Sequence, residues 1–320
     1  MERRQIGATG IAVTALGFGA SGLGSMPDTY GYAVDEARAR ETLHAIFDGP
    51  VNLLDTSNAY GFGRSEERIG AAIRERGGLP PGFVLSTKLD RDMETGRFDG
   101  DRALRSLEES LGRLGLDSVP LLHLHDPEYG RDLSEITGKG GALDTLFRLK
   151  EEGLAGAVGL AMGRLDLMTE LLADRPFDAL ISHNRWTLLN RSADALFDTA
   201  HARGIAVLNA APYAGGVLAK GSAEMPRVTY QEADDRSLAP VREIEALCAR
   251  HDVAPGAAAL QFSLRDPRVA ATIVGVTKPG RVHESLSWAE TAIPEAFWTD
   301  LAAFRPATDD PEAKRVYRPG

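Results

Sequence analysis

The sequence predicts an α/β fold, a closed (β/α)8 barrel that forms one domain over residues 1–320. Short apolar segments alternate with longer amphipathic segments eight times along the chain. The short segments are apolar on both faces, as expected of parallel strands that helices cover. Eight strand–helix units close naturally into a barrel of this length. No G-x-G-x-x-G motif follows the first strand, which disfavours an open doubly wound sheet.

The short apolar segments predict the strands and the amphipathic segments predict the helices, in chain order. The predicted strands are Thr14–Gly19, Val51–Asp55, Phe83–Lys88, Val119–His125, Leu154–Leu160, Phe177–Ser182, Ile205–Asn209 and Ala270–Val276. The predicted helices are Asp35–Phe47, Ser65–Arg76, Asp101–Leu114, Ala142–Glu152, Arg164–Ala173, Ala193–Arg203, Pro240–Arg250 and Gly280–Trp288. Before the first strand, RQIGATGIAV holds a turn between two extended pieces, which predicts an N-terminal β-hairpin that closes the barrel floor. The long aperiodic stretch Tyr213–Leu238 is expected to be a functional loop.

Composition excludes several classes of function. The net charge of −10 and the pI of about 5.3 disfavour binding to nucleic acid or to an anionic membrane surface. Cys248 is the single cysteine and is expected to pack in the core. No apolar run is long enough to span a bilayer and no signal peptide is visible, so we expect a cytoplasmic protein. The sequence leaves the oligomeric state open.

Four side chains suited to acid–base chemistry lie at the ends of three consecutive strands. Asp55, Lys88 and His125 end the second, third and fourth strands, and Tyr60 follows Asp55 by five residues. Taken singly, each has an ordinary reading as a turn, cap or surface residue. Their joint occurrence at the strand ends, where barrel enzymes carry their active sites, predicts a catalytic set. His123 points to the same face one layer deeper and is expected to be a core or supporting residue.

The four residue types fit the proton transfer that accompanies hydride transfer. A free tyrosine has a pKa near ~10 and is a poor base at neutral pH. A neighbouring ammonium favours the phenolate and is expected to lower the pKa of Tyr60, while Asp55 would keep Lys88 charged and in place. The imidazole of His125 could hydrogen-bond the substrate oxygen or share its proton.

These segments resemble the aldo-keto reductase family. NLLDTSNAYGFGRSEERIG is similar to the family's Asp…Tyr-Gly…Ser-Glu signature, and STK and LLHLHDPE resemble its lysine and histidine segments. The resemblance runs from LGFGASGLG to VGVTKPGRVHESL. It implies a (β/α)8 TIM barrel and an NADP or NAD cofactor. In that reading Tyr60 is the general acid/base, Lys88 and Asp55 tune it, and His125 orients the substrate.

The resemblance also implies where the nicotinamide half of the cofactor binds. The family's Ser-Asn pair for the carboxamide is replaced by Ala161 and Met162, which cannot make those hydrogen bonds. Asn184 stands where the family has a glutamine, and its alternative role is a strand-end turn residue. Ala210 takes the place of the stacking aromatic, with Tyr213 close by.

The remaining cofactor contacts are expected after the seventh and eighth strands. Backbone amides around Gly216 and Leu218 are candidates for the pyrophosphate. The adenosine side corresponds to Gly275, Thr277, Arg281 and Glu284, and Lys278 could compensate for the lysine that Gly275 replaces. Arg281 would stack on adenine or contact a 2′-phosphate, or it is a solvated helix residue. NAD and NADP both stay open.

The segments NAAPYAGGVLA, HDPE and NRWTLLN resemble the aldose 1-dehydrogenase branch, which acts on L-fucose and D-threo-aldoses and has a pyridoxal 4-dehydrogenase as a relative. This implies oxidation of a sugar hemiacetal to a lactone, with Trp186, His183, Tyr30 and Trp288 as candidates to line the pocket. The alternatives are a pyridoxal 4-dehydrogenase or general aldehyde reductase of the same family, and a nicotinamide-binding sensor or regulatory subunit with little turnover. No metal site is predicted, because His123 and His125 are the only close pair of ligands.

Overall fold

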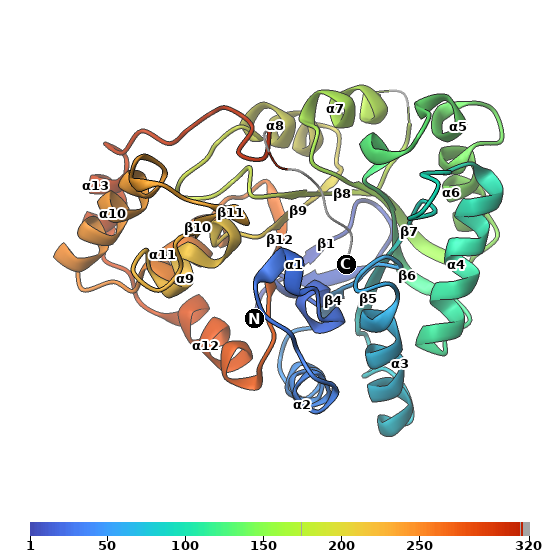
Figure 1. Ribbon diagram of the computed structural model, residues 1–320, viewed down its shortest axis with the longest axis horizontal. Coiled ribbons are helices and arrows are strands. Elements are labelled where there is room, and N and C mark those ends of the chain that lie inside the picture. Colours follow the sequence, from blue (N-terminus) through green and yellow to red (C-terminus); the bar gives the residue numbers. More distant parts are fainter. Residues whose placement is uncertain (174, 314, 316–320) are drawn as a thin grey trace.

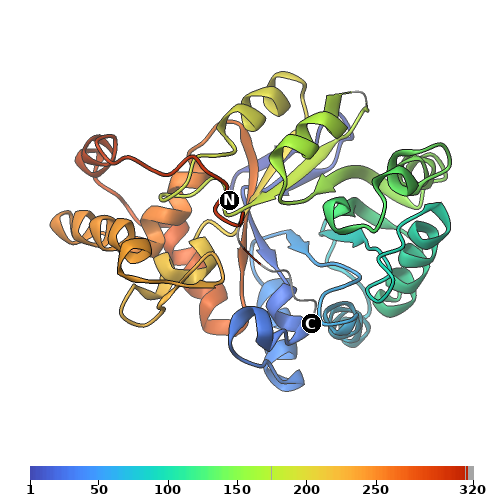
Figure 2. The ribbon, with the colours of Figure 1, turned by 45° about the horizontal axis from the view of Figure 1, so that its top comes forward.

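The computed structural model describes residues 1–173, 175–313 and 315, and it has a closed barrel of eight parallel strands at its centre (Figures 1 and 2). The predicted (β/α)8 barrel is therefore confirmed. In barrel order the strands are β12 (Val269–Gly275), β3 (Leu16–Gly19), β4 (Leu53–Asp55), β5 (Val84–Leu89), β6 (Val119–His125), β7 (Ala155–Ala161), β8 (Ala179–His183) and β9 (Ala206–Ala210).

Two apolar layers hold the barrel together. Side chains that point inward, among them Leu53, Leu121 and Leu208, fill its interior and have no exposed surface. Side chains that point outward, such as Leu54 and Leu122, pack under the surrounding helices. Because both faces of each strand are buried, the strands are apolar throughout, which is why they read as continuous apolar runs in the sequence.

At least one helix follows each strand and lies on the outside of the barrel (Figure 2). These helices are α2 (Glu36–Phe47), α3 (Arg64–Arg76), α4 (Gly100–Leu114), α6 (Ala142–Glu151), α7 (Leu165–Ala173), α8 (Asp194–Ala202), α11 (Pro255–Leu264) and α12 (Pro279–Glu290). Asp35 and Asp99 cap α2 and α4 by accepting hydrogen bonds from the backbone amides of Arg38 and Arg102.

The helix between β9 and β12 differs from the prediction. The segment expected there is α10 (Asp235–Arg250), which begins five residues earlier than Pro240, after the cap Asp234. A further helix, α11, follows it and packs against β12 and α12. Its sequence PGAAALQFSL lacks a polar face, because α11 is buried on several sides, so helical periodicity did not reveal it.

An antiparallel hairpin of β1 (Arg3–Gln5) and β2 (Ala12–Thr14) lies at the end where the strands begin, as predicted. Ile6 and Val13 are fully buried against the interior layer of the barrel. Arg4 donates hydrogen bonds to the carbonyls of Leu264 and of Val269, the first residue of β12. The hairpin therefore closes the barrel floor and leaves the opposite end open for a site.

Short elements cover the opposite end. They are η1 (Ser21–Gly24), α1 (Pro27–Tyr30), η2 (Pro127–Tyr129), α5 (Leu133–Thr137), η3 (Ala214–Gly216), α9 (Val217–Lys220), β10 (Arg227–Val228) and β11 (Gln231–Glu232). The last four lie within the stretch Tyr213–Leu238, and elements this short give no periodicity in the sequence. No helix in the described part of the chain is long and apolar enough to cross a membrane.

The C-terminal segment returns to this covered end after α13 (Glu295–Leu301). In Figure 1 the red segment runs from α13 towards α8. The backbone of Ala307 bonds to that of Leu189 and Arg191, and the Pro311 carbonyl accepts hydrogen bonds from Thr229 and Gln231. These contacts bring Glu312 over the ends of the barrel strands.

Candidate active site

Three neighbouring barrel strands bring the predicted catalytic residues together. Asp55 is the last residue of β4, Lys88 lies near the end of β5, and His125 is the last residue of β6. Tyr60 lies on the turn between β4 and α3, and its ring faces the imidazole of His125 edge-on at a centroid distance of 5.6 Å. The four side chains thus form one cluster at the carboxyl ends of the strands.

The ammonium of Lys88 is the centre of this cluster. Lys88 is 1% exposed, and its Nζ donates to Asp55 Oδ2 at 2.7 Å, to the Thr56 carbonyl at 2.5 Å and to Tyr60 Oη at 3.2 Å. Ser86 donates a further hydrogen bond to Asp55. All three donors of the ammonium are used, so the buried charge is compensated and the phenol is fixed in place.

The expected lowering of the pKa of Tyr60 is not what the structure gives. Burial raises the pKa of Tyr60 well above its usual value, and the carboxylate of Asp55 adds to the effect. The carboxylate offsets the ammonium charge that would favour a phenolate. Tyr60 is therefore a phenol at neutral pH, which can donate a proton or a hydrogen bond but is not itself a ready base.

His125 is held by an acid that the sequence reasoning did not single out. Asp90 lies two residues beyond Lys88, in STKLD, and its Oδ1 is 2.6 Å from Nδ1 of His125. Burial lowers the pKa of His125, but the carboxylates of Asp90 and Asp126 outweigh it and raise that pKa. The signal available in the sequence was a second carboxylate at the same strand end as the catalytic lysine.

His123 lies one layer below, as its spacing predicted. It is fully buried, with Nδ1 3.3 Å from Ser86 Oγ, and burial lowers its pKa well below the usual value. Its imidazole is therefore neutral. Within residues 1–173, 175–313 and 315 there is no group of three or more His, Cys, Asp and Glu side chains that could hold a metal ion.

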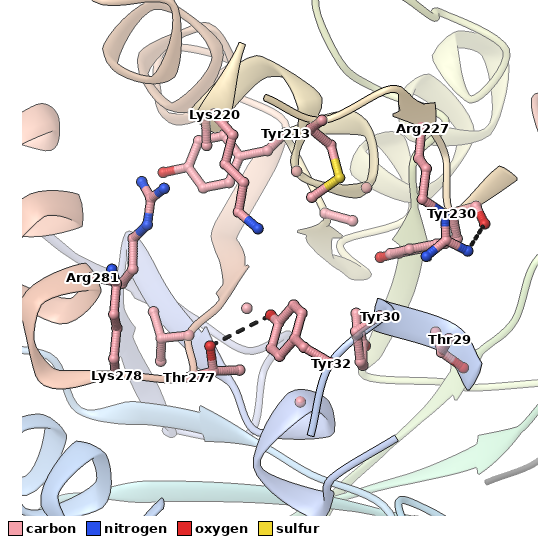
Figure 3. Close-up of a pocket in the computed structure, with 18 of the residues that line it drawn as sticks. Thr29, Tyr30, Tyr32, Tyr213, Lys220, Arg227, Tyr230, Thr277, Lys278 and Arg281 are labelled. Atoms are coloured by element: carbon pink, nitrogen blue, oxygen red, sulfur yellow. Dashed lines mark hydrogen bonds between the residues drawn. The ribbon is translucent and has the colours of Figure 1, made fainter. Parts of the chain in front are cut away.

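A cavity of about 360 Å³ lies between the loops that follow β3, β9 and β12 (Figure 3). Of the predicted cofactor residues, Gly216, Gly275, Thr277 and Arg281 line it. A Cβ atom at Gly22 would lie only 2.5 Å from the Thr277 side chain, so a larger residue there would fill the space. The cavity is thus built from the segments that the resemblance assigned to the cofactor.

The charge of this cavity is strongly positive. Among the described residues that line it, five are basic and none is acidic; the basic ones are Arg38, Lys220, Arg227, Lys278 and Arg281. In Figure 3 the ammonium of Lys220 points into the cavity. Burial lowers the pKa of Lys220, and the nearby charges of Arg281 and Lys278 lower it further. An anionic ligand would relieve this repulsion, so the lining fits the phosphates of a dinucleotide.

Other predicted cofactor residues lie outside the lining. Leu218 is buried in the apolar core, and its amide, like that of Gly216, donates to the carbonyl of Tyr213. Glu284 forms an ion pair with Arg281. Ala210 ends β9, and the next residue, Ala211, reaches the cavity. The roles of these positions in cofactor binding stay predictions.

The region predicted to hold the nicotinamide carboxamide contains a contact that the sequence did not predict. Ala161 and Met162 are buried apolar residues. The Nδ2 of Asn184 donates to Glu312 at 2.7 Å, and its Oδ1 has no hydrogen-bond partner among the described residues. Glu312 belongs to the C-terminal segment, so its position at the barrel mouth could not be read from the sequence.

The carboxylate of Glu312 is the centre of a buried ionic cluster. It lies 3.1 Å from His183 Nε2, 2.7 Å from an Arg315 nitrogen and 3.5 Å from Arg185. Burial opposes the charge, but His183, Arg185 and Arg315 outweigh it and hold the pKa of Glu312 far below its usual range. The cluster fastens the C-terminal segment over the site.

The predicted pocket residues fall in three places. Tyr30 and Trp288 line the cationic cavity, where Tyr30 donates a hydrogen bond to Ser21. His183 lies at the barrel mouth with Glu312. Trp186 instead packs against Phe197 and Phe262 under the outer helices, so it is a core residue.

Comparison with known proteins agrees with this geometry. Residues 15–305 match the Aldo/keto reductase family. Pyridoxal 4-dehydrogenase of Microbacterium luteolum is 29% identical, and the alignment covers 94% of this chain and 96% of that protein. D-threo-aldose 1-dehydrogenase of a Pseudomonas species is also 29% identical, over 93% and 96%. L-galactose dehydrogenase of Arabidopsis thaliana is 31% identical, over 90% and 88%.

Similarity to solved structures supports the fold. The holo form of an aldo-keto reductase from Bacillus halodurans superposes with a TM-score of 0.76 at 20% identity, with 99% of this chain and 100% of that chain covered. At this identity the likeness concerns the barrel alone.

Proposed function

The chain belongs to the aldo/keto reductase family and is an NAD(P)-dependent oxidoreductase, and from this premise we propose that it is an aldose 1-dehydrogenase of the L-fucose or D-threo-aldose type. Its substrate would be the cyclic hemiacetal of a small sugar, and its product a lactone. The single domain over residues 1–320 would carry both the cofactor and the substrate.

The observation that carries this proposal is the adjacency of two structures. One is the buried set of Asp55, Lys88, Tyr60 and His125 at the strand ends. The other is the cationic cavity, whose lining includes Gly22 in the loop after β3; the same loop meets the backbone of Tyr60 at Gly24. An anionic dinucleotide in the cavity would place its reactive end next to the acid–base set.

The cofactor would be held mainly by charge. Lys220, Lys278 and Arg281 are suited to its phosphates, and Thr277 and the open position at Gly275 to its ribose. When bound, the nicotinamide supplies the hydride acceptor or donor. Asn184 is the candidate for the carboxamide, since its side-chain oxygen has no partner among the described residues.

The proton at the reacting oxygen would be handled by Tyr60. Its hydroxyl gives a proton when a carbonyl is reduced and takes one when a hydroxyl is oxidised. The role of Lys88, with Asp55, is to fix the phenol and to stabilise negative charge on its oxygen as the proton moves. His125 would orient the substrate beside the phenol.

A polyhydroxylated substrate suits the groups around this point. The carboxylate of Asp126 lies 3.7 Å from Nε2 of His125 and carries two acceptor oxygens at the strand ends. Hydroxyl groups of a sugar can satisfy such acceptors, whereas an apolar aldehyde would leave them unpaired. The related D-threo-aldose and L-galactose dehydrogenases support a sugar substrate.

The test is a substrate panel with the purified protein. L-fucose, D-arabinose, L-galactose, pyridoxal and simple aldehydes are each offered with NAD or NADP, and reduced nicotinamide is followed by absorbance. Sugar-dependent reduction of the cofactor supports the proposal and decides between NAD and NADP. Reduction of aldehydes without oxidation of any sugar would refute the aldose assignment and leave the family unchanged.

A second candidate is a pyridoxal 4-dehydrogenase, which the similarity over 94% of this chain favours. Turnover of pyridoxal in preference to every sugar would decide for it. The sensor alternative has one relative in its favour, a probable voltage-gated potassium channel subunit beta that is 27% identical over 89% of this chain. Cofactor binding without any turnover would decide for that role.

A further inference from the structure

Asp90 occupies a site of its own behind His125. It is 1% exposed and lies just beyond the end of β5. Three donors surround its carboxylate: Nδ1 of His125 at 2.6 Å, the backbone amide of Ala59 at 2.9 Å, and the hydroxyl of Ser57. A carboxylate buried with three hydrogen bonds is held in one orientation, so its effect is directed at the imidazole.

This contact fixes which nitrogen of His125 carries the hydrogen. Burial works against the charge on Asp90, but the imidazole of His125 and the hydrogen bonds from His125, Ser57 and Ala59 lower the pKa of Asp90. An ionised carboxylate can only accept, so the hydrogen between it and Nδ1 belongs to the imidazole. When His125 is neutral, its Nε2 therefore has a free lone pair and can accept a proton.

Several other groups face the imidazole and set its charge. The carboxylate of Asp126 lies 3.7 Å from Nε2 and favours the protonated form, as Asp90 does. The ammonium of Lys88 opposes protonation, and so does burial. His123 below it is neutral, and Tyr60 beside it is a phenol. Two carboxylates against one ammonium favour the protonated form of His125 and raise its pKa.

Because its pKa is raised, Tyr60 already carries its phenolic proton at neutral pH and cannot keep a second one on its oxygen. A proton that reaches its oxygen during oxidation must therefore be matched by a proton that leaves it. The imidazole of His125 packs edge-on against the Tyr60 ring, with a centroid distance of 5.6 Å, and in its neutral form offers Nε2 as an acceptor. We propose that Asp90 is a positioning residue that makes His125 the proton reservoir of the site.

The step balances in atoms and charge. In the oxidative direction the substrate O–H bond breaks and an O–H bond forms at Tyr60, while the phenolic proton of Tyr60 passes to Nε2 of His125. The imidazole becomes an imidazolium paired with Asp90, and the electron pair of the substrate C–H bond goes to the nicotinamide cofactor. In the reductive direction each proton moves back along the same atoms.

The inference rests on the proposed function for its catalytic part, but its structural part can be tested without substrate. In ¹⁵N-labelled wild-type protein, the imidazole resonances of His125 are followed by NMR against pH and assigned by their loss in His125→Gln. We expect the Nδ1–H tautomer when the ring is neutral, and a pKa above the ordinary value of about 6.5. An Nε2–H tautomer, or a pKa below 6, would overturn the inference whether or not the protein turns over any substrate.

The matched variants are Asp90→Asn and, as a control, Asp101→Asn, which removes the same charge from an exposed position on α4. Asp90→Asn should lower the pKa of His125, because the carboxylate that favours the imidazolium is removed. It should also lower kcat for oxidation ~10²-fold or more, with KM changed little, because the tautomer is no longer fixed. The acid limb of the oxidation profile should move to lower pH, since His125 must be neutral to accept the proton.

A merely structural role for Asp90 predicts something else. It would lower stability and the yield of active enzyme while leaving the pH limb where it is in the wild type, and that result would refute the positioning role. If Asp90→Asn does not fold, the wild-type NMR titration still decides. If the titration agrees and no substrate is turned over, the proposed function fails while the tautomer assignment stands.

Discussion

Replacement of Lys88 by methionine should cost the protein much of its stability, because it leaves a buried carboxylate without its partner. Methionine has a similar length and apolar stem, so packing changes little. The three hydrogen bonds from Nζ are lost, and among the described residues Ser86 is then the one side chain that still donates to Asp55, whose side chain is 8% exposed. Removal of one partner from a buried ion pair costs about 3–5 kcal/mol.

The double variant Asp55→Asn/Lys88→Met separates this cost from loss of packing. An asparagine at position 55 is uncharged and can still accept the hydrogen bond from Ser86. We therefore expect the double variant to be more stable than Lys88→Met alone, by about 2 kcal/mol or more, since no buried charge is left uncompensated. The changes in the free energy of unfolding caused by the two single substitutions are not expected to add up to that of the double variant.

The assay is urea-induced unfolding followed by circular dichroism, with the wild type, both single variants and the double variant at pH 7. Activity is measured in parallel, and we expect it to be lost in every variant that lacks the ammonium. Two results would refute this explanation: Lys88→Met lowers the free energy of unfolding by less than ~1 kcal/mol, or the double variant is no more stable than Lys88→Met. Either result would show that the unpaired charge of Asp55 is not what destabilises the variant.

Three further predictions concern the phenol, the cationic cavity and the C-terminal segment. Tyr60→Phe should lower turnover ~10²-fold or more while the dissociation constant for the cofactor, measured by fluorescence titration, stays within about twofold; wild-type turnover would contradict its assigned role. Lys278→Ala/Arg281→Ala should weaken cofactor binding ~10-fold or more and reduce its salt dependence, because these side chains line a cavity whose described residues include no acidic one; an Arg305→Ala control should bind as the wild type does. Glu312→Gln should loosen the C-terminal segment, which is measured as faster hydrogen exchange over residues 305–313. Because the folded-state pKa of Glu312 is lowered, its stabilising effect is present above the unfolded carboxyl pKa of about 4.3 and is lost as pH falls below that value. The variant should therefore differ most from the wild type at neutral pH and least in acid. Equal exchange at neutral pH would argue against the fastening role.

Local pattern determined the barrel and the place of its chemistry. The eight strands read as apolar runs because both faces of each are buried, and the hairpin read as a turn between extended pieces. Asp55, Lys88 and His125 could be grouped because parallel strands of a barrel end at the same side, so position along each strand is enough to predict proximity.

Only the tertiary structure decided what depends on contacts between distant segments. Helix α11 was not predicted from the sequence, because a helix that is buried on several sides lacks an amphipathic pattern. The pKa of Tyr60 depends on its burial and on the opposite charges of Asp55 and Lys88, and residue types alone do not give the balance of these effects. Asp90 behind His125 and Glu312 over Asn184 required the fold, since the chain must bring residues 35 and 128 positions apart into hydrogen-bond distance.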